Sequence, residues 1–185
     1  MSLLILVAVA LAIALWGVSV YNGLVRRKNI VAEAWSGIEA QLKRRADLIP
    51  NLVETVKGYA GHERATFEDL AKLRSAGQAQ SDVAQRAQTE QAITAAIGRV
   101  LAVAEAYPQL RASENFQSLQ KDLAEVEDQI QLARRYYNGA VRDFNVMIEQ
   151  FPSSLIAGRT GFKSASFFEI DNAADRAVPK VSFAG

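Results

Sequence analysis

The chain has 185 residues, a formal net charge of +1 at pH 7 and no cysteine. The small net charge provides no general attraction to nucleic acid, and the absence of cysteine excludes disulfides, thiolate nucleophiles and cysteine-ligated metals. Hydrophobic residues make up 50% of the chain and only four residues are proline, which favours a helical fold with a sizeable core.

The N-terminal segment from Leu3 to Val20 carries no charge and has roughly the minimum length for a membrane-spanning helix. No basic residue precedes it and no clear cleavage site follows, so we expect an uncleaved single-pass anchor rather than a signal peptide. Two aromatic and three basic residues are expected at the membrane interface: Trp16, Tyr21, Arg26, Arg27 and Lys28. Because the basic residues follow the span, the positive-inside rule places the N-terminus outside and the bulk of the chain in the cytoplasm.

The anchor also carries small residues at spacings that let membrane helices approach closely, namely Ala8, Ala10, Ala12, Ala14 and Gly17. This pattern favours self-association of the anchor. The alternative is a lone span that only tethers the rest of the chain, because small pairs also arise by chance in an alanine-rich segment.

The first helix after the anchor is predicted from about Tyr21 to Ala60. Residues that face a partner helix recur at alternating spacings of four and three, which defines a coiled-coil-like seam: Val31, Trp35, Ile38, Leu42, Arg45, Ile49, Leu52, Val56 and Tyr59. The same register continues backward into the anchor, so both segments are expected to form one long rod. Pro50 predicts a kink that frees the carbonyl of Ala46; the alternative is a break, with Asp47 capping a second helix.

Three more helices are predicted, from about His62 to Ala76, from Ser81 to Tyr107, and from Ser113 to Phe151. The helix from Ser81 to Tyr107 has seam residues at Ile93, Ile97, Val100, Ala104 and Tyr107. The last helix has a seam that alternates spacings of three and four from Phe116 to Phe151, and it ends at Pro152. We therefore predict an all-α fold, in which an N-terminal transmembrane helix continues into an antiparallel four-helix bundle with an irregular C-terminal tail. The expected division is an anchor at 1–22, a bundle at 23–152 and a tail at 153–185, the tail packing partly against the bundle, a neighbouring chain or the membrane.

Arg45 lies on the seam, and a buried guanidinium needs a partner because an unpaired buried charge is very costly. Register suggests Glu105 or Glu127. Two pairs of polar residues are added to this predicted polar network between helices: Asp47 with Asn51 on the first helix, and Asn138 with Asn145 on the fourth. One hypothesis is that the network only fixes helix register; the other is that part of it contacts a partner.

Three blocks resemble the signature segments of the bacterial LemA family: QLKRRADLIPNLVETVKGYAGHE, AEAYPQLRASENFQSLQKDL and ARRYYNGAVRDFNVMIEQFP. The early YNGLV is similar to the family's N-terminus, and the resemblance extends to about Phe168, whereas Asn172 to Gly185 match no family pattern. VEDQI, from Val126, departs from the more usual Glu-Asn pair. The resemblance implies a membrane-anchored helical bundle without an agreed biochemical activity, encoded in many bacteria beside a membrane zinc metalloprotease.

The sequence lacks the residue patterns of common catalytic sites. The single histidine, His62, leaves no Glu-x-x-His pair for a di-iron site and no second ligand for a zinc protease. No nucleophile elbow and no phosphate-binding loop is present. We therefore expect no enzyme activity, no cofactor, no metal and no nucleic-acid partner.

Two functions are consistent with these patterns. The first is a scaffold that self-assembles as a homo-oligomer at the bacterial inner membrane and helps to maintain the cell envelope. The second is a monomeric tethered adaptor that binds another membrane protein, such as a protease. In both cases the lipid bilayer is an expected partner.

Overall fold

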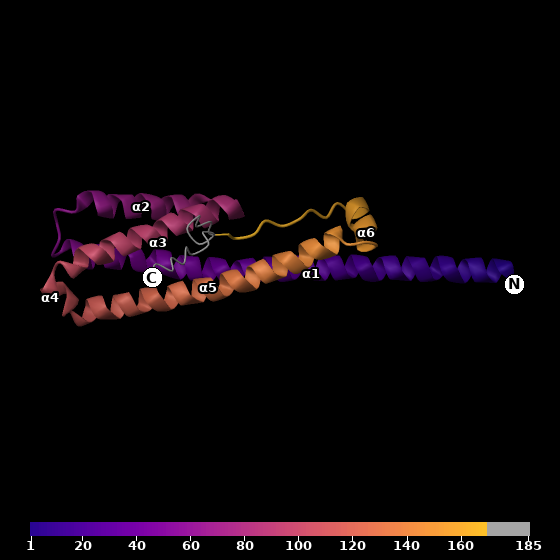
Figure 1. Ribbon diagram of the computed structural model, residues 1–185, viewed down its shortest axis with the longest axis horizontal. Coiled ribbons are helices and arrows are strands. Elements are labelled where there is room, and N and C mark those ends of the chain that lie inside the picture. Colours follow the sequence, from indigo (N-terminus) through magenta and orange to yellow (C-terminus); the bar gives the residue numbers. More distant parts are fainter. Residues whose placement is uncertain (170–185) are drawn as a thin grey trace, which may run out of the picture.

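The computed structural model describes residues 1–169, which form six helices and no strand (Figure 1). The helices are α1 (Ser2–Lys57), α2 (Arg64–Ala79), α3 (Val83–Glu105), α4 (Pro108–Arg111), α5 (Glu114–Glu149) and α6 (Ser153–Thr160). The all-α prediction is confirmed. The predicted tail beyond residue 169, including Phe183, lies outside the described residues.

Helix α1 is a single helix of 56 residues that contains both the anchor and the first bundle helix. Its seam is buried from Ile38 to Val56, so the apolar spacing decides which face meets the bundle. Tyr59 is wrongly placed on the seam: it follows the end of the helix and is 47% exposed.

Pro50 lies on the exposed side of α1 and does not end the helix, as the favoured prediction of a continuous helix required; the alternative of a break at Asp47 is wrong. The carbonyl of Ala46, which Pro50 cannot bond, accepts a hydrogen bond from Arg74 Nε of α2 at 2.7 Å. A neighbouring helix therefore replaces the backbone bond that proline removes. This contact also ties α2 to the middle of the rod.

Helix α5 runs antiparallel to α1 along most of the bundle, and the α2–α3 hairpin covers the end far from the N-terminus (Figure 1). Three buried apolar clusters follow one another along this axis. The far cluster is centred on Leu52, Leu70, Val100 and Phe116, the middle one on Ile38, Val126 and Tyr137, and the near one on Leu24, Phe144 and Ala157. The seam residues predicted on α3 and α5 supply much of these clusters.

Two helices are additional to the prediction. Pro108 begins the short α4 instead of only ending α3, because proline is well suited to the first turn of a helix. Within the predicted irregular tail, 153–160 forms α6, which closes at Gly161 in the left-handed conformation (φ 75°). Helix α2 extends to Ala79, three residues beyond its predicted end at Ala76. Phe151, the predicted last residue of the fourth helix, lies beyond α5 and is 80% exposed.

Candidate functional site

Among residues 1–169, the most deeply buried charged side chain is Arg45, which is 2% exposed. Its Nη1 donates to Glu127 Oε2 of α5 at 2.6 Å and to Thr94 Oγ1 of α3 at 2.7 Å. Its Nη2 donates to the carboxylate of Glu90 at 2.6 Å and to the Glu90 carbonyl at 3.2 Å. One guanidinium therefore joins three helices, and the structure brings together Arg45 and Glu127 as the register suggested.

Glu90 is the residue that sequence reasoning missed, although it is only 4% exposed. A second cation, Arg86, donates to Glu90 Oε1 at 2.6 Å and also to the carbonyl of Gly77 on α2. Two arginines thus face two glutamates, so the network is balanced in charge. Glu90 stands three residues before Ile93 on the predicted α3 seam, and extending that seam by one step would have found it.

The other predicted members of this network lie elsewhere. Glu105 is exposed at the end of α3, far along the helix from Glu90, so its proposed pairing with Arg45 is wrong. Asp47 is exposed and accepts from Lys43 Nζ at 2.7 Å, four residues away on the same face. Asn51 is exposed, and only its backbone carbonyl accepts a side-chain bond, from Thr55. Asp47 and Asn51 point to solvent because each follows a buried seam residue, Arg45 or Ile49, by two positions.

Asn138 and Asn145 do not connect helices, which corrects the predicted network. Each holds the extended segment after α6 by a pair of amide bonds to its backbone. Asn145 donates to the Ala165 carbonyl at 3.0 Å and accepts from the Ala165 amide at 2.8 Å. Asn138 does the same with Phe168, at 3.2 and 2.9 Å. The two asparagines therefore hold the segment 162–169 along α5 as a clamp, through bonds to its backbone and not to its side chains.

An aromatic cluster completes this clamp. Phe168 is fully buried, and its ring centroid lies 5.7 Å from that of Trp35, which in turn lies 5.4 Å from Tyr137. The Tyr137 hydroxyl donates to the carbonyl of Ser166 at 2.8 Å. Burial raises the pKa of Tyr137 above its usual value of 10.0 because the charged phenolate would lose solvation.

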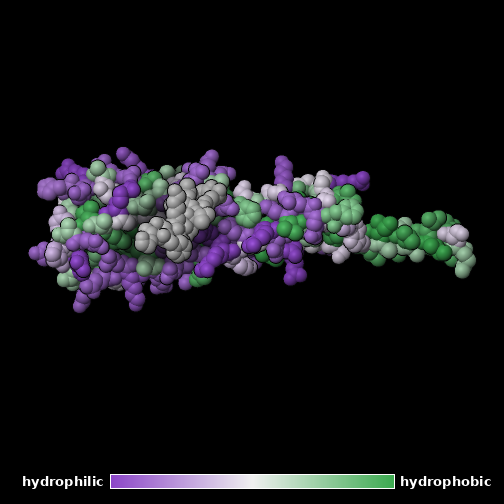
Figure 2. Space-filling model, viewed as in Figure 1, coloured by the Kyte–Doolittle hydropathy of each residue, from purple (hydrophilic) through white to green (hydrophobic). Residues whose placement is uncertain are grey.

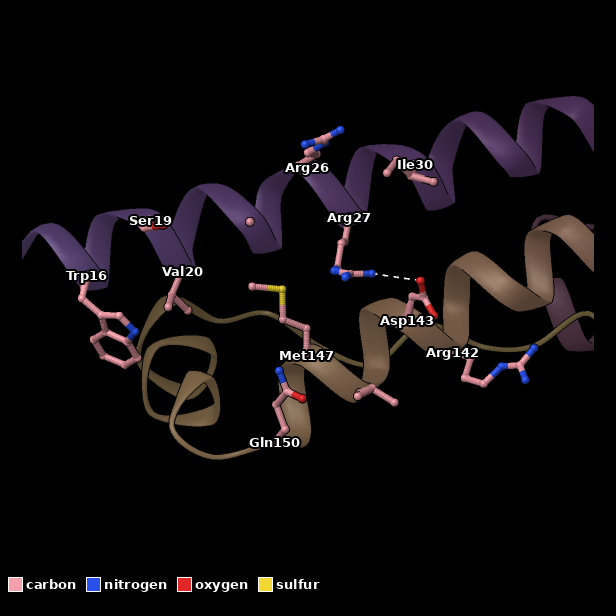
Figure 3. Close-up of a pocket in the computed structure, with 12 residues that line it drawn as sticks. Trp16, Ser19, Val20, Arg26, Arg27, Ile30, Arg142, Asp143, Met147 and Gln150 are labelled. Carbon is pink, nitrogen blue, oxygen red and sulfur yellow. Dashed lines mark hydrogen bonds and ion pairs between the residues drawn. The ribbon is translucent and has the colours of Figure 1, made fainter.

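A groove of about 820 Å³ lies between α1 and α5 at the end of the bundle nearest the anchor (Figure 3). Arg27 crosses it and donates to Asp143 Oδ2 at 3.0 Å. Met147 fills the space over Gly23, where an added Cβ would lie 2.7 Å from Met147 Cε. Trp16 and Val20 line the end toward the anchor, whereas the Arg26 side chain points away from α5 (Figure 3).

The anchor extends beyond the bundle as a bare apolar rod (Figure 2). Its most apolar stretch is fully exposed and is the one segment among residues 1–169 long and apolar enough to cross a membrane. The small residues Ala8, Ala10, Ala12 and Ala14 are all exposed, whereas Gly17 is half-buried and faces Ile156 of α6, 3.8 Å from the position of a Cβ. Four of the residues predicted at the membrane interface are exposed on α1, namely Trp16, Tyr21, Arg26 and Lys28. Their contact with a bilayer stays a prediction.

Residues 34–183 match the LemA family over most of the chain. The chain belongs to the LemA family. The match runs past Phe168, so the expectation that Asn172 to Gly185 carry no family pattern is wrong for most of that segment.

Three relatives of this LemA-family chain come from three bacteria. The chain is similar to magnetosome protein MamQ 2 of Paramagnetospirillum magneticum, 26% identical over 184 residues, covering 85% of this chain and 68% of the relative. Magnetosome protein MamQ of Magnetospirillum gryphiswaldense is 25% identical with the same coverage. Protein LemA of Metamycoplasma hominis is 26% identical over 149 residues, covering 80% of this chain and 68% of the relative.

The buried ion pairs of this LemA-family chain join α1, α3 and α5. Both carboxylates of the network are held by arginine, and no group of three His, Asp or Glu side chains within residues 1–169 is placed to hold a metal. A pocket of about 230 Å³ opens beside Arg45 and Glu127, but its other walls include Ile97, Leu101 and Leu123. The exposed apolar helix, the family membership and the magnetosome relatives together indicate a membrane-associated protein.

Proposed function

We propose that the protein is a non-enzymatic scaffold that self-assembles at the bacterial inner membrane, with a place in maintaining the cell envelope. The observation that carries the proposal is α1 itself, one uninterrupted helix with an exposed apolar end and a bundle built on the remainder. A rigid junction of this kind fixes the bundle relative to the membrane, so that associating anchors would bring the bundles into a repeated arrangement.

The anchor offers a surface for this association. Ala10 and Ala14 are exposed and continue the seam of α1 into the membrane, where small residues allow close approach of backbones. Two relatives are named as magnetosome proteins, which supports a role at a membrane. The only histidine, His62, is exposed in the turn between α1 and α2, which favours a non-catalytic role.

The mass of the detergent-extracted full-length protein tests the proposal. We expect a defined oligomer in the wild type, and monomers when Ala10 and Ala14 are both changed to Ile. The matched control changes Ala8 and Ala12 to Ile, which adds the same volume on another face and should leave the oligomer intact. A monomeric wild type would reject self-assembly and favour the tethered adaptor.

We also propose that the N-terminus faces out and that the bundle lies in the cytoplasm, because Arg26, Arg27 and Lys28 follow the span directly. The chain has no cysteine, so a single Ser118→Cys on the exposed face of α5 provides a unique label site. An impermeant thiol reagent should leave this cysteine unlabelled in intact cells and label it after lysis. Labelling in intact cells would contradict this orientation and show that the bundle faces outward.

A further inference from the structure

Helix α6 is held against the point where the anchor leaves the bundle (Figure 1). Its inner face buries Ser153 and Ala157, and Ile156 packs over Gly17 of α1. Just past its end, the ring of Phe162 meets Tyr21 edge to face, with centroids 5.9 Å apart. These contacts fix α6 beside residues 17–24 of α1.

Two large apolar side chains on the outward side, Leu155 of α6 and Phe151 just before the helix, are left exposed by the packing of the chain. Phe151 and Leu155 are four positions apart and are 80% and 58% exposed. Val146, Trp16 and Tyr21 are further large side chains exposed near this end of the bundle. Several large apolar side chains left exposed at one end of a small domain indicate a contact with another phase or molecule.

The depth of α6 identifies that phase. At a rise of about 1.5 Å per residue, the uncharged segment from Leu3 to Val20 spans about 27 Å, close to the thickness of a hydrocarbon core. Residues 17–24 then cover about 10 Å across the end of the core and the adjoining headgroup layer. Because α6 packs beside these residues, its outer face lies at the boundary between headgroups and acyl chains.

The charges near α6 fit the same boundary. Arg159 in its last turn and Lys163 just after it are exposed, as are Arg26 and Lys28 on α1. The nearby acidic residues are Asp143, which is paired with Arg27, and the exposed Glu149. Basic residues beside exposed apolar ones are typical of segments that lie in the interface of membranes with anionic lipids.

We propose that α6 and Phe151 form a second membrane contact, which inserts Phe151 and Leu155 into the interface of the leaflet from which the anchor emerges. The occupant of this apolar face is the lipid bilayer. The protein would then hold its membrane at two points, a span and an interfacial helix, which fixes both the depth and the rotation of α1.

Spin labels at single cysteines test this in full-length protein reconstituted into vesicles of phosphatidylcholine and phosphatidylglycerol. The sites are Leu155→Cys on α6, Leu132→Cys on α5 as an aqueous control with 52% exposure, and Leu11→Cys as a label within the anchor. We expect the Leu155 label to collide readily with oxygen and to be shielded from a water-soluble nickel chelate. The Leu132 label should show the reverse.

Each other outcome overturns the proposal in a distinguishable way. A Leu155 label as open to nickel as the Leu132 label means that α6 is in water, and a label shielded from both agents means that protein covers it. The Leu11 label keeps this result separate from anchoring. If the label at Leu11 is shielded from nickel and the label at Leu155 is accessible to it, only the proposed α6 contact is wrong. If the label at Leu11 is accessible to nickel, the segment does not span the membrane and the anchor itself is wrong.

Discussion

Replacing Arg45 by Met is the most informative single change, because Met keeps most of the side-chain volume and removes the charge. The substitution deletes the bonds to Thr94, Glu127 and Glu90 and leaves a buried carboxylate with one cation fewer. Removing one partner of a buried ion pair typically costs about 3–5 kcal/mol. Glu90 retains Arg86, and Glu127 is 29% exposed and retains Gln131, so we expect the lower end, about 3 kcal/mol.

This loss is measurable as a fall in the free energy of unfolding, followed by circular dichroism during denaturation in detergent. For a chain of this size, about 3 kcal/mol lowers Tm by about 6–12 °C. Arg44→Met is the matched control on the adjacent position, because Arg44 and Glu125 are exposed and 3.4 Å apart; it should cost less than about 0.5 kcal/mol.

A double variant separates the charge from the packing. Arg45→Met combined with Glu127→Met removes one ion pair of the network and leaves Glu90 paired with Arg86. It should recover part of the loss, because apolar replacements of a buried pair are often neutral. If Arg45→Met costs no more than Arg44→Met, or if the double variant is less stable than Arg45→Met, the network does not hold the helices as reasoned here.

Three further changes test other contacts. Arg74→Met should lower the free energy of unfolding by about 1.5 kcal/mol in the wild type. In Pro50→Ala it should lower it by less than about 0.5 kcal/mol, because the amide of residue 50 can again donate to the Ala46 carbonyl. Equal losses in urea titrations would show that the Arg74 bond does not replace the missing backbone bond. Asn145→Leu should accelerate amide exchange at Ala165 by about 5–30-fold, with a smaller change at Phe168, and Asn138→Leu should reverse the order. The pKa of Tyr137 is raised in the folded state, so its contribution to stability is complete below pH 10 and is lost as pH rises through the folded value. Tyr137→Phe should therefore reduce the fall in Tm with rising pH above pH 10. An unchanged dependence of Tm on pH would show that Tyr137 does not cause this fall.

Much of the fold follows from one kind of information, the alternating apolar spacing. Because that spacing fixes which face of α1, α3 and α5 is buried, the helices and their antiparallel order were predictable, whereas the predicted C-terminal ends differ from the observed ones by up to three residues. Helix α6 was not predictable, because eight residues are too few to establish a period. Its buried residues, Ser153 and Ala157, are small, and nothing in the sequence indicates that they pack against α1.

The polar contacts were predictable only where they lie on a seam. Arg45 and Glu127 were found because one interrupts the apolar pattern and the other adjoins it. The asparagine clamp was missed because an extended segment has no register against a helix, so nothing in the sequence aligns Ala165 with Asn145. The division of the chain at residue 152 stays a prediction, although α5 ends close to it.

The unbroken length of α1 makes it a lever. From Val20 to Lys57 the helix extends about 55 Å past the apolar segment at 1.5 Å per residue. A tilt of about 20°, which is ordinary for membrane helices, would carry its far end sideways by about 19 Å. A small change in the tilt of α1 therefore moves the turn between α1 and α2 a long way. A change in bilayer thickness that alters this tilt would displace the α2–α3 hairpin.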